Sequence, residues 1–439
     1  MSVPSLCVVL AAAGLLFALP RRWCILPFLI VAGYIPFGQV MEIGPVHFTG
    51  LRVLIAVGIL RVLSKGEHLA GGINALDKLM WLWGAWFACA SMFHESDALV
   101  TRLGEVFTDL GIYFLCRIFL QDMGDIVHAF KIVCVAFAPL AALLLLESMT
   151  GRNFFGLIFG GWTDALVRHG HFRAQGPFEH PILAGTVGAV CLPMAMYLWR
   201  QNRMLSLFGL ASAGGIIVAS ASSGPIMTAF SIFAAIALWK FRGGLSAIRW
   251  AAVILLIALN FVMSDPVYFL VARIDITGGS TGWYRAQLIR SAIEHFNEWW
   301  LAGTDVTRHW MSVAIDKKNT DITNYYLRMG VWGGLPLMFI FMTILYSAFA
   351  AVGRALRLAE NAPSGHQFLI WILGAILFGH ATTFFSVSYF DQTVFFLYSL
   401  LAVIGSLKAA VLSTAPVEAA AGQGRADYDA APEAQVHYG

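Results

Sequence analysis

Charged side chains are scarce in this 439-residue chain: Lys, Arg, Asp and Glu make up 12% of it, whereas hydrophobic residues make up 59%. A soluble globular protein has about 25% charged and about 45–50% apolar residues. The mean hydropathy of +0.74 points the same way, and these values exclude a water-soluble enzyme. The length would allow two or three soluble domains, but the composition indicates one polytopic membrane domain.

Three further features are weak or missing. The net charge of +3 is small and scattered, which argues against nucleic acid as a partner. The six cysteines lie in apolar runs without metal-ligand spacing, so we expect small buried side chains and neither disulfides nor metal ligands. No internal repeat stands out, which weakens the prediction of a transporter built from two related halves.

Long apolar runs fill most of the chain. A bilayer-spanning helix needs about 17–25 mostly apolar residues. By that criterion the sequence predicts an all-α, polytopic membrane helix bundle of about 12–13 transmembrane helices, with a large outer loop containing short helices. The predicted spans are Val3–Pro20, Trp23–Val40, Leu51–Leu63, Leu79–Phe93, Val106–Leu120, Ile126–Leu146, Pro181–Trp199, Leu205–Ser220, Pro225–Trp239, Ile248–Met263, Tyr325–Ala350, Phe368–Val387 and Thr393–Leu412.

The basic residues predict the orientation of these helices. Lys and Arg fall on alternate connections, and the positive-inside rule makes those connections cytoplasmic. The long loops 150–180 and 264–324 then lie on the opposite side, together with the short loop around Asp391. The first helix is followed by Arg21 and Arg22 and has no basic flank before it, which predicts an outward N-terminus and not a cleaved signal peptide.

These features divide the chain into four parts. We expect N-terminal transmembrane helices in residues 1–148, a core that includes the outer loop in residues 149–350, and C-terminal transmembrane helices in residues 351–414. Residues 415–439 are rich in Ala, Gly and small polar residues, which predicts a disordered cytoplasmic tail.

The loop 150–180 ends in a segment suited to binding an anion. Pro181 fits the first position of a helix, with Glu179 and His180 beside its N-terminus. A helix N-terminus exposes unpaired backbone N–H groups and about half a positive charge. Arg173 adds a guanidinium that can bind a phosphate through two hydrogen bonds.

The segment Ser220-Ala-Ser-Ser-Gly-Pro225 places a second helix start on the same side, where a serine such as Ser222 or Ser223 can cap the helix. Ordinary capping explains each helix start separately. Both together, with Arg173, suit a phosphate or pyrophosphate at the outer membrane surface.

The second long loop contains a predicted amphipathic helix. At about 100° per residue, Arg285 lies in the middle of one apolar face, and Arg290 and Glu294 lie opposite with the i,i+4 spacing of a solvated ion pair. A cation on a buried face needs an anionic partner or a polar cavity. Arg285 is therefore the stronger functional candidate, with a structural salt bridge as the alternative. The apolar face consists of Leu288, Ile289, Ala292, Phe296 and Trp299.

Three histidines of the first loop, His169, His171 and His180, raise the question of a metal ion. No His, Asp or Glu cluster at helical spacing accompanies them. We therefore expect no metal and no other cofactor.

Three places, taken in this order, resemble the bacterial O-antigen ligase and polysaccharide polymerase family. The first is Arg173-Ala-Gln-Gly-Pro-Phe-Glu-His-Pro-Ile-Leu-Ala-Gly185, and the second is Ser220-Ala-Ser-Ser-Gly224. The third is the large outer loop with Arg285, Leu301-Ala-Gly-Thr304, Asp321-Ile-Thr-Asn-Tyr-Tyr-Leu327 and Gly330-Val-Trp-Gly333. The resemblance covers residues 170–337.

This resemblance implies metal-independent glycosyl transfer on the periplasmic side of a bacterial inner membrane. The donor would be a glycan on undecaprenyl pyrophosphate, surrounded by membrane lipids, and the partners would be chain-length regulator or export proteins. Arg285 matches the outer-loop arginine of the family, the best candidate for the pyrophosphate contact.

The chain departs from the family pattern at two places. Ser223 stands where many members have an arginine, which leaves Arg173 as a substitute. Thr323-Asn324 stands where ligases carry His-Asn, which favours an exopolysaccharide or O-antigen polymerase over a ligase that transfers glycan to lipid A core. A transporter or flippase of the same lipid-linked glycan and a non-catalytic scaffold are the further alternatives.

The candidate residues have two kinds of role. His180, Glu179 and Asp321 are candidates for the base that accepts the hydroxyl proton, and tyrosines can stack on sugars, with interfacial anchoring as the alternative. The predicted catalytic residues are Arg285, Arg173 and His180, and the predicted substrate contacts are Glu179, Ser222, Ser223, Arg290, Asp321, Asn324 and Tyr326.

Overall fold

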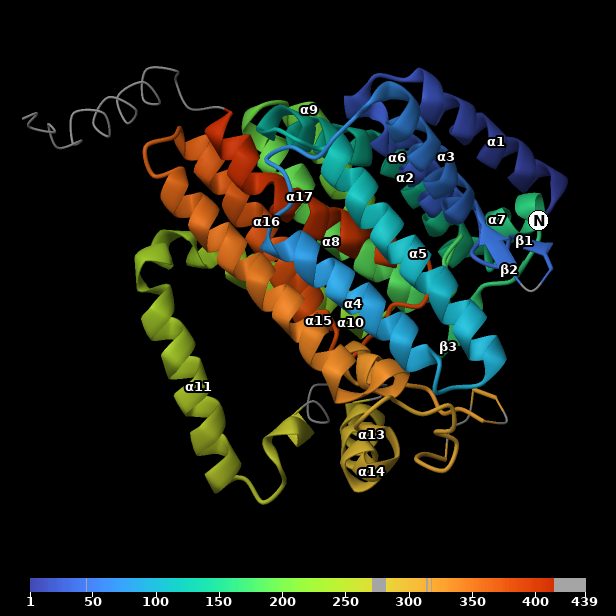
Figure 1. The fold of residues 1–439 in the computed structure, drawn as a ribbon, viewed down its shortest axis with the longest axis vertical. Coiled ribbons are helices and arrows are strands. Elements are labelled where there is room, and N and C mark those ends of the chain that lie inside the picture. Colours follow the sequence, from blue (N-terminus) through green and yellow to red (C-terminus); the bar gives the residue numbers. More distant parts are fainter. Residues whose placement is uncertain (45, 271–281, 313–314, 317, 414–439) are drawn as a thin grey trace, which may run out of the picture.

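The computed structural model describes residues 1–439 except 45, 271–281, 313–314, 317 and 414–439. Of the described residues, 73% are helical (Figure 1), which confirms the predicted helical fold class. Two short antiparallel hairpins interrupt the helices: β1 (Val40–Ile43) pairs with β2 (Val46–Thr49), and β3 (Leu166–Arg168) pairs with β4 (His171–Arg173). The predicted tail, residues 415–439, lies outside the described residues.

Each of the predicted spans coincides with a helix of its own, although several boundaries differ. The predicted helix to Val40 ends at Tyr34, because Pro36 and the first hairpin follow it. The helices are α1 (Val3–Ala18), α2 (Ile25–Tyr34), α3 (Gly50–Lys65), α4 (Ala75–Ser91), α5 (Ser96–Phe119), α6 (Met123–Thr150), α7 (Phe154–Phe159), α8 (Pro181–Tyr197), α9 (Arg203–Ala219), α10 (Ser223–Ala237), α11 (Leu245–Val262), α13 (Gly282–Glu294), α14 (Phe296–Trp299), α15 (Tyr325–Leu358), α16 (Ser364–Thr383) and α17 (Val394–Leu412).

Five helical segments of the described chain are long and apolar enough to cross a membrane: Met123–Thr150, Pro181–Arg200, Ser223–Val262, Tyr325–Leu358 and Val394–Leu412. The third segment contains α11, which stands apart from the bundle in Figure 1 and has no buried residue. A helix that is apolar all round and uncovered by protein needs another apolar surrounding. This feature suggests a membrane protein, and the larger number of spans stays a prediction.

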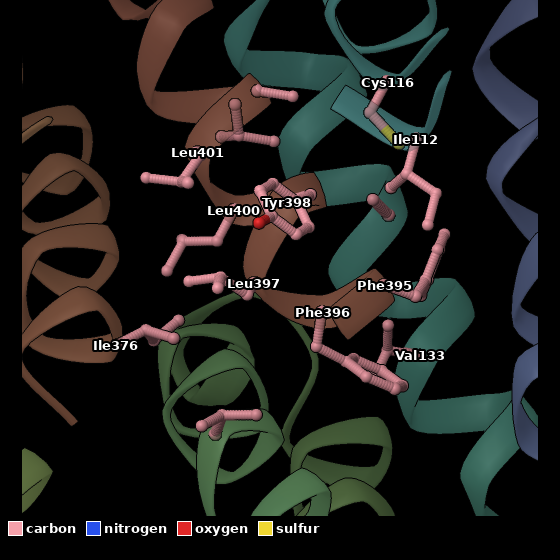
Figure 2. Close-up of a cluster of buried hydrophobic side chains, with 14 of the residues drawn as sticks. Ile112, Cys116, Val133, Ile376, Phe395, Phe396, Leu397, Tyr398, Leu400 and Leu401 are labelled. Carbon is pink, nitrogen blue, oxygen red and sulfur yellow. The ribbon is translucent and has the colours of Figure 1, made fainter. Parts of the chain in front are cut away.

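The hydrophobic core of the bundle surrounds α17. Figure 2 shows Phe396 of α17 beside Val133 of α6, and Phe395 and Leu397 of α17 belong, with Ile112 of α5, to the same cluster of buried side chains. Four of the six cysteines are buried as predicted, whereas Cys7 and Cys89 are exposed on α1 and α4.

A break in α15 fixes the loop that precedes this helix to the bundle. Gly333 and Gly334 have non-helical backbone angles, and Gly334 has φ +72°, where a Cβ would meet the Leu301 carbonyl oxygen at 2.2 Å. The loop fills the break. The Thr304 amide donates to the Val331 carbonyl at 2.9 Å, and the Leu335 amide donates to the Trp300 carbonyl at 2.7 Å. The segments 300–304 and 331–335 therefore bind each other.

A buried ion pair holds α4 against α5 on the side away from that loop. Asn74 and Asp77 form a capping box at the start of α4. The Asp77 carboxylate accepts from Arg117 Nε and Nη2, both at 3.1 Å, and from the Tyr113 hydroxyl at 2.7 Å. Both charged side chains are almost completely buried. The apolar-run analysis did not predict this pair.

Removing one partner leaves an uncompensated buried charge. We expect Asp77→Asn to lower the free energy of unfolding by about 3–5 kcal/mol, measured by denaturation in mild detergent. Asp164→Asn is the matched control, because Asp164 and its partner Arg152 are exposed and such pairs contribute about 0–1 kcal/mol. Equal losses in the two variants would contradict the structural role of the buried pair.

Candidate functional site

The segments predicted to share one face of the protein meet in space. The Ala174 amide, directly after β4, donates to the Ala219 carbonyl at the end of α9 at 2.9 Å. The Glu179 amide donates to Asp391 Oδ2 at 3.0 Å. These bonds bring the hairpin, the start of α8, the start of α10 and the loop before α17 together.

The β3–β4 hairpin places two arginines on one side. His169 and Gly170 form its turn with φ of 51° and 78°, and positive φ at both central residues is typical of a tight type I′ turn. The register pairs Arg168 with His171 and Leu166 with Arg173. Because side chains alternate along a strand, Arg168 and Arg173 point to the same face of the hairpin.

Arg173 reaches the start of α10. Its Nη2 donates to Ser222 Oγ at 2.7 Å, and that hydroxyl donates to the Ser220 carbonyl at 2.8 Å. The Nε of Arg173 is buried without a hydrogen-bond partner among the described residues. The guanidinium is therefore held in place, and its Nε–H donor is unused.

The two helix N-termini on this face differ. His180 caps α8, since its Nδ1 accepts from the Ile182 amide at 3.2 Å. Ser222 precedes α10 but makes no capping bond to it, because its hydroxyl points to the Ser220 carbonyl. Of the two predicted anion sites, the structure leaves the N-terminus of α10 uncapped.

A cavity of about 250 Å³ opens at this uncapped end. Arg285 of α13 lines it, and the Nε of Arg285 is buried without a hydrogen-bond partner in the described chain. The other polar lining residues are Ser223, Thr228, Ser231, Thr382, Thr383 and Ser386. The cavity thus combines a helix N-terminus, a guanidinium and hydroxyl groups, which suits an anion with several acceptor oxygens.

The arginines of the site repel one another. Burial and the charge of Arg168 lower the pKa of Arg173. Burial and the same arginine also lower the pKa of Arg285, against which Asp321 acts in the opposite direction. Burial, Arg173 and Arg168 lower the pKa of His180 to about 4. An anion between these groups would relieve their repulsion.

Two carboxyl groups border the positive cluster. Burial raises the pKa of Asp321, and the charges of Arg328 and Arg285 pull it down again. The Tyr284 hydroxyl donates to the Asp321 carbonyl at 2.8 Å, which ties this residue to α13. Partial burial and the Asp391 carboxylate raise the pKa of Glu179.

Three other predicted contacts have partners within the protein and do not line the cavity around Arg285. Arg290 pairs with Glu294 at 3.5 Å, and both side chains are exposed, as the i,i+4 spacing predicted. Asn324 caps α15, with its side chain accepting from the Leu327 amide at 3.0 Å. The Tyr326 hydroxyl donates to the Ala381 carbonyl at 2.8 Å.

The predicted apolar face of α13 is only partly correct. Leu288, Ala292 and Trp299 are buried in a separate small core, whereas Phe296 is exposed. The difference arises because α13 ends at Glu294 and α14 begins at Phe296, so the helical spacing does not continue through this segment.

A second cavity, of about 230 Å³, lies between the first hairpin, α5 and the start of α15. Glu105 Oε2 and Gln392 Oε1, from two of its lining residues, are buried without a hydrogen-bond partner in the described part of the chain. The sequence analysis missed these residues. The i,i+4 spacing of Glu105 and Asp109 at the start of a predicted apolar span was an available signal.

The histidines considered for a metal ion do not gather. Among the described residues, His169, His171 and His180 are not members of any three-ligand group. No family model and no curated protein matches the sequence.

The low pKa of His180 predicts a pH-dependent stability. An unfolded histidine takes up a proton near pH 6.5, whereas folded His180 does so only near pH 4. Acidification from pH 6.5 to 4 therefore favours the unfolded chain. We expect His180→Asn, which keeps a capping acceptor but cannot titrate, to lose less thermal stability over this range than the wild type. Parallel profiles in detergent would contradict the assignment.

Proposed function

We propose that the chain is a membrane glycosyltransferase of the polysaccharide polymerase type, as its resemblance to that family implies. It moves a glycan from undecaprenyl pyrophosphate to an acceptor sugar hydroxyl at the periplasmic face of a bacterial inner membrane. One observation carries the proposal: Arg285 and the uncapped N-terminus of α10 line one cavity, and Arg173 and Arg168 lie close enough to add positive charge.

The pyrophosphate of the donor fits the chemistry of this cavity. Guanidinium groups bind phosphate oxygens through paired hydrogen bonds, and free backbone N–H groups at a helix start bind them as well. Arg173 and Arg168 supply the charge that other family members carry at the position of Ser223. A hydrophobic polyprenyl tail would remain in the bilayer beside this site.

In the proposed reaction the acceptor hydroxyl oxygen attacks the anomeric carbon of the donor glycan. The bond from that carbon to the pyrophosphate oxygen breaks, and polyprenyl pyrophosphate leaves with the electron pair. Arg285 and Arg173 stabilise the negative charge that develops on the leaving group. No metal is required for this step.

Asp321 is the carboxylate that we assign as the proton acceptor. It is electrostatically coupled to Arg285, and burial raises its pKa, which makes it a stronger base. His180 is less suitable, because its Nδ1 caps α8 and its pKa is only about 4. The second cavity, with Glu105, Gln392 and Tyr325 in its lining, offers hydrogen-bonding groups and an aromatic ring for the acceptor glycan.

Arg285→Ala tests the proposal directly. With purified protein in nanodiscs and lipid-linked repeat units as substrate, we expect the rate of glycan lengthening to fall by about 10²–10³-fold, because the leaving group loses a charge partner. Arg152→Ala is the matched control, since this arginine is exposed in a neighbouring loop and pairs with exposed Asp164; its rate should stay unchanged.

Three outcomes would contradict the proposed polymerase. If Arg285→Ala lengthened the glycan at the wild-type rate, Arg285 would have no role in the reaction. Transfer of the glycan to lipid A core by the wild type would indicate a ligase, and movement of the donor across the bilayer without a new bond would indicate a transporter.

Asp321→Asn tests the proton acceptor. We expect the rate of transfer to fall by about 10²–10⁴-fold, while binding of undecaprenyl pyrophosphate is retained because the arginines are intact. The wild-type rate should also fall on acidification, as Asp321 becomes protonated, and this dependence should be absent in the variant. If Glu179→Gln lowered the rate of transfer and Asp321→Asn did not, Glu179 would be the proton acceptor in place of Asp321.

A further inference from the structure

Three potential metal ligands meet in the outer loop, away from the arginine cavity. His295 follows α13, Glu298 lies in α14, and His309 comes from the segment after them. One ligand atom from each lies within 4.8 Å of the others. His309 Nε2 is 2.9 Å from Glu298 Oε2.

The surrounding hydrogen bonds orient these groups as metal sites require. His295 Nδ1 lies 2.8 Å from the Ser291 carbonyl. Since a carbonyl oxygen only accepts, Nδ1 carries the proton and Nε2 keeps a free lone pair. Trp310 Nε1 donates to Glu298 Oε2 at 3.0 Å. A carbonyl behind a histidine and a donor behind a carboxylate are the outer partners that fix metal ligands.

We propose that His295, Glu298 and His309 bind a divalent transition-metal ion, with Zn²⁺ as the best match. Two imidazoles and one carboxylate suit zinc better than magnesium or calcium, which prefer oxygen ligands. Zinc–ligand distances of about 2.0–2.2 Å place tetrahedral ligand atoms about 3.3 Å apart. The ligand atoms, which lie within 4.8 Å of one another, would draw together to this spacing, and a zinc ion would replace the proton between His309 and Glu298.

The bound ion would join two parts of the outer loop. His295 and Glu298 belong to the α13–α14 segment, and His309 belongs to the segment that follows it. Both segments already share the small core that contains Trp299, Trp310 and Met311. Because α13 carries Arg285, the ion would hold the helix of that arginine in place and would take no part in the glycosyl transfer. The inference stands without the proposed function, since metal binding is measured with no glycan present.

Titration of the full-length protein with ZnCl₂ tests the site. The protein carries no polyhistidine tag, is first treated with a chelator and is held in detergent. We expect one zinc ion per chain by calorimetry and a rise in the unfolding temperature. His309→Gln, at an exposed position where folding should be retained, should weaken binding by more than about 100-fold, and Trp310→Phe by about 10–100-fold.

The double variant His169→Gln/His171→Gln is the matched control, because it removes two histidines from another outer loop. It should bind zinc as the wild type does. Wild type that binds no zinc beyond the detergent blank would overturn the inference and leave an ordinary hydrogen-bonded His–Glu pair. Equal binding by the wild type and His309→Gln would overturn it as well, since the zinc would then be held elsewhere.

Discussion

Electrostatic repulsion among arginines dominates the face of the protein that carries the β3–β4 hairpin, α13 and the start of α10. Arg168 and Arg173 point to one side of a hairpin, and the charge of Arg168 lowers the pKa of both Arg173 and Arg285. The fold holds these like charges together through the Arg173–Ser222 hydrogen bond and through the packing of α13 on its own small core. A positive site that is rigid before ligand arrives loses little free energy to reorganisation when negative charge develops.

The helices could be predicted from the sequence because the signal is local. An apolar run of sufficient length identifies a span without knowledge of its neighbours, and every predicted span coincides with a helix. The errors occur where the chain leaves this pattern. Pro36 and the first hairpin follow α2 earlier than predicted, and the loop helix stops at Glu294 and begins again at Phe296. Hydropathy carries no information about such breaks.

The candidate site was only partly predictable. Arg173, Ser222 and Arg285 were found because helix starts and a cation on an apolar face have local signatures. The structure joins Arg173 to Ser222 and places Arg285 in the cavity lined by the neighbouring Ser223. Arg168 was missed because its place depends on the hairpin register. Asn324 and Tyr326 have side chains whose partners lie at their own helix start or on α16, and sequence alone cannot separate such structural bonds from ligand contacts.

At the break in α15, three hydrogen bonds join the helix to other segments of the chain. The Val331 and Gly333 carbonyls, which a continuous helix would use internally, accept from the Thr304 amide and from Trp86 Nε1, and the Leu335 amide donates to Trp300. The eight residues from Tyr325 to Trp332 form the short piece before the break. Val331 of this piece is bonded to the preceding loop, and its Trp332 stacks on Phe87 of α4. A tilt of α4 would be passed to this short piece, and with it to Asp321 just before it.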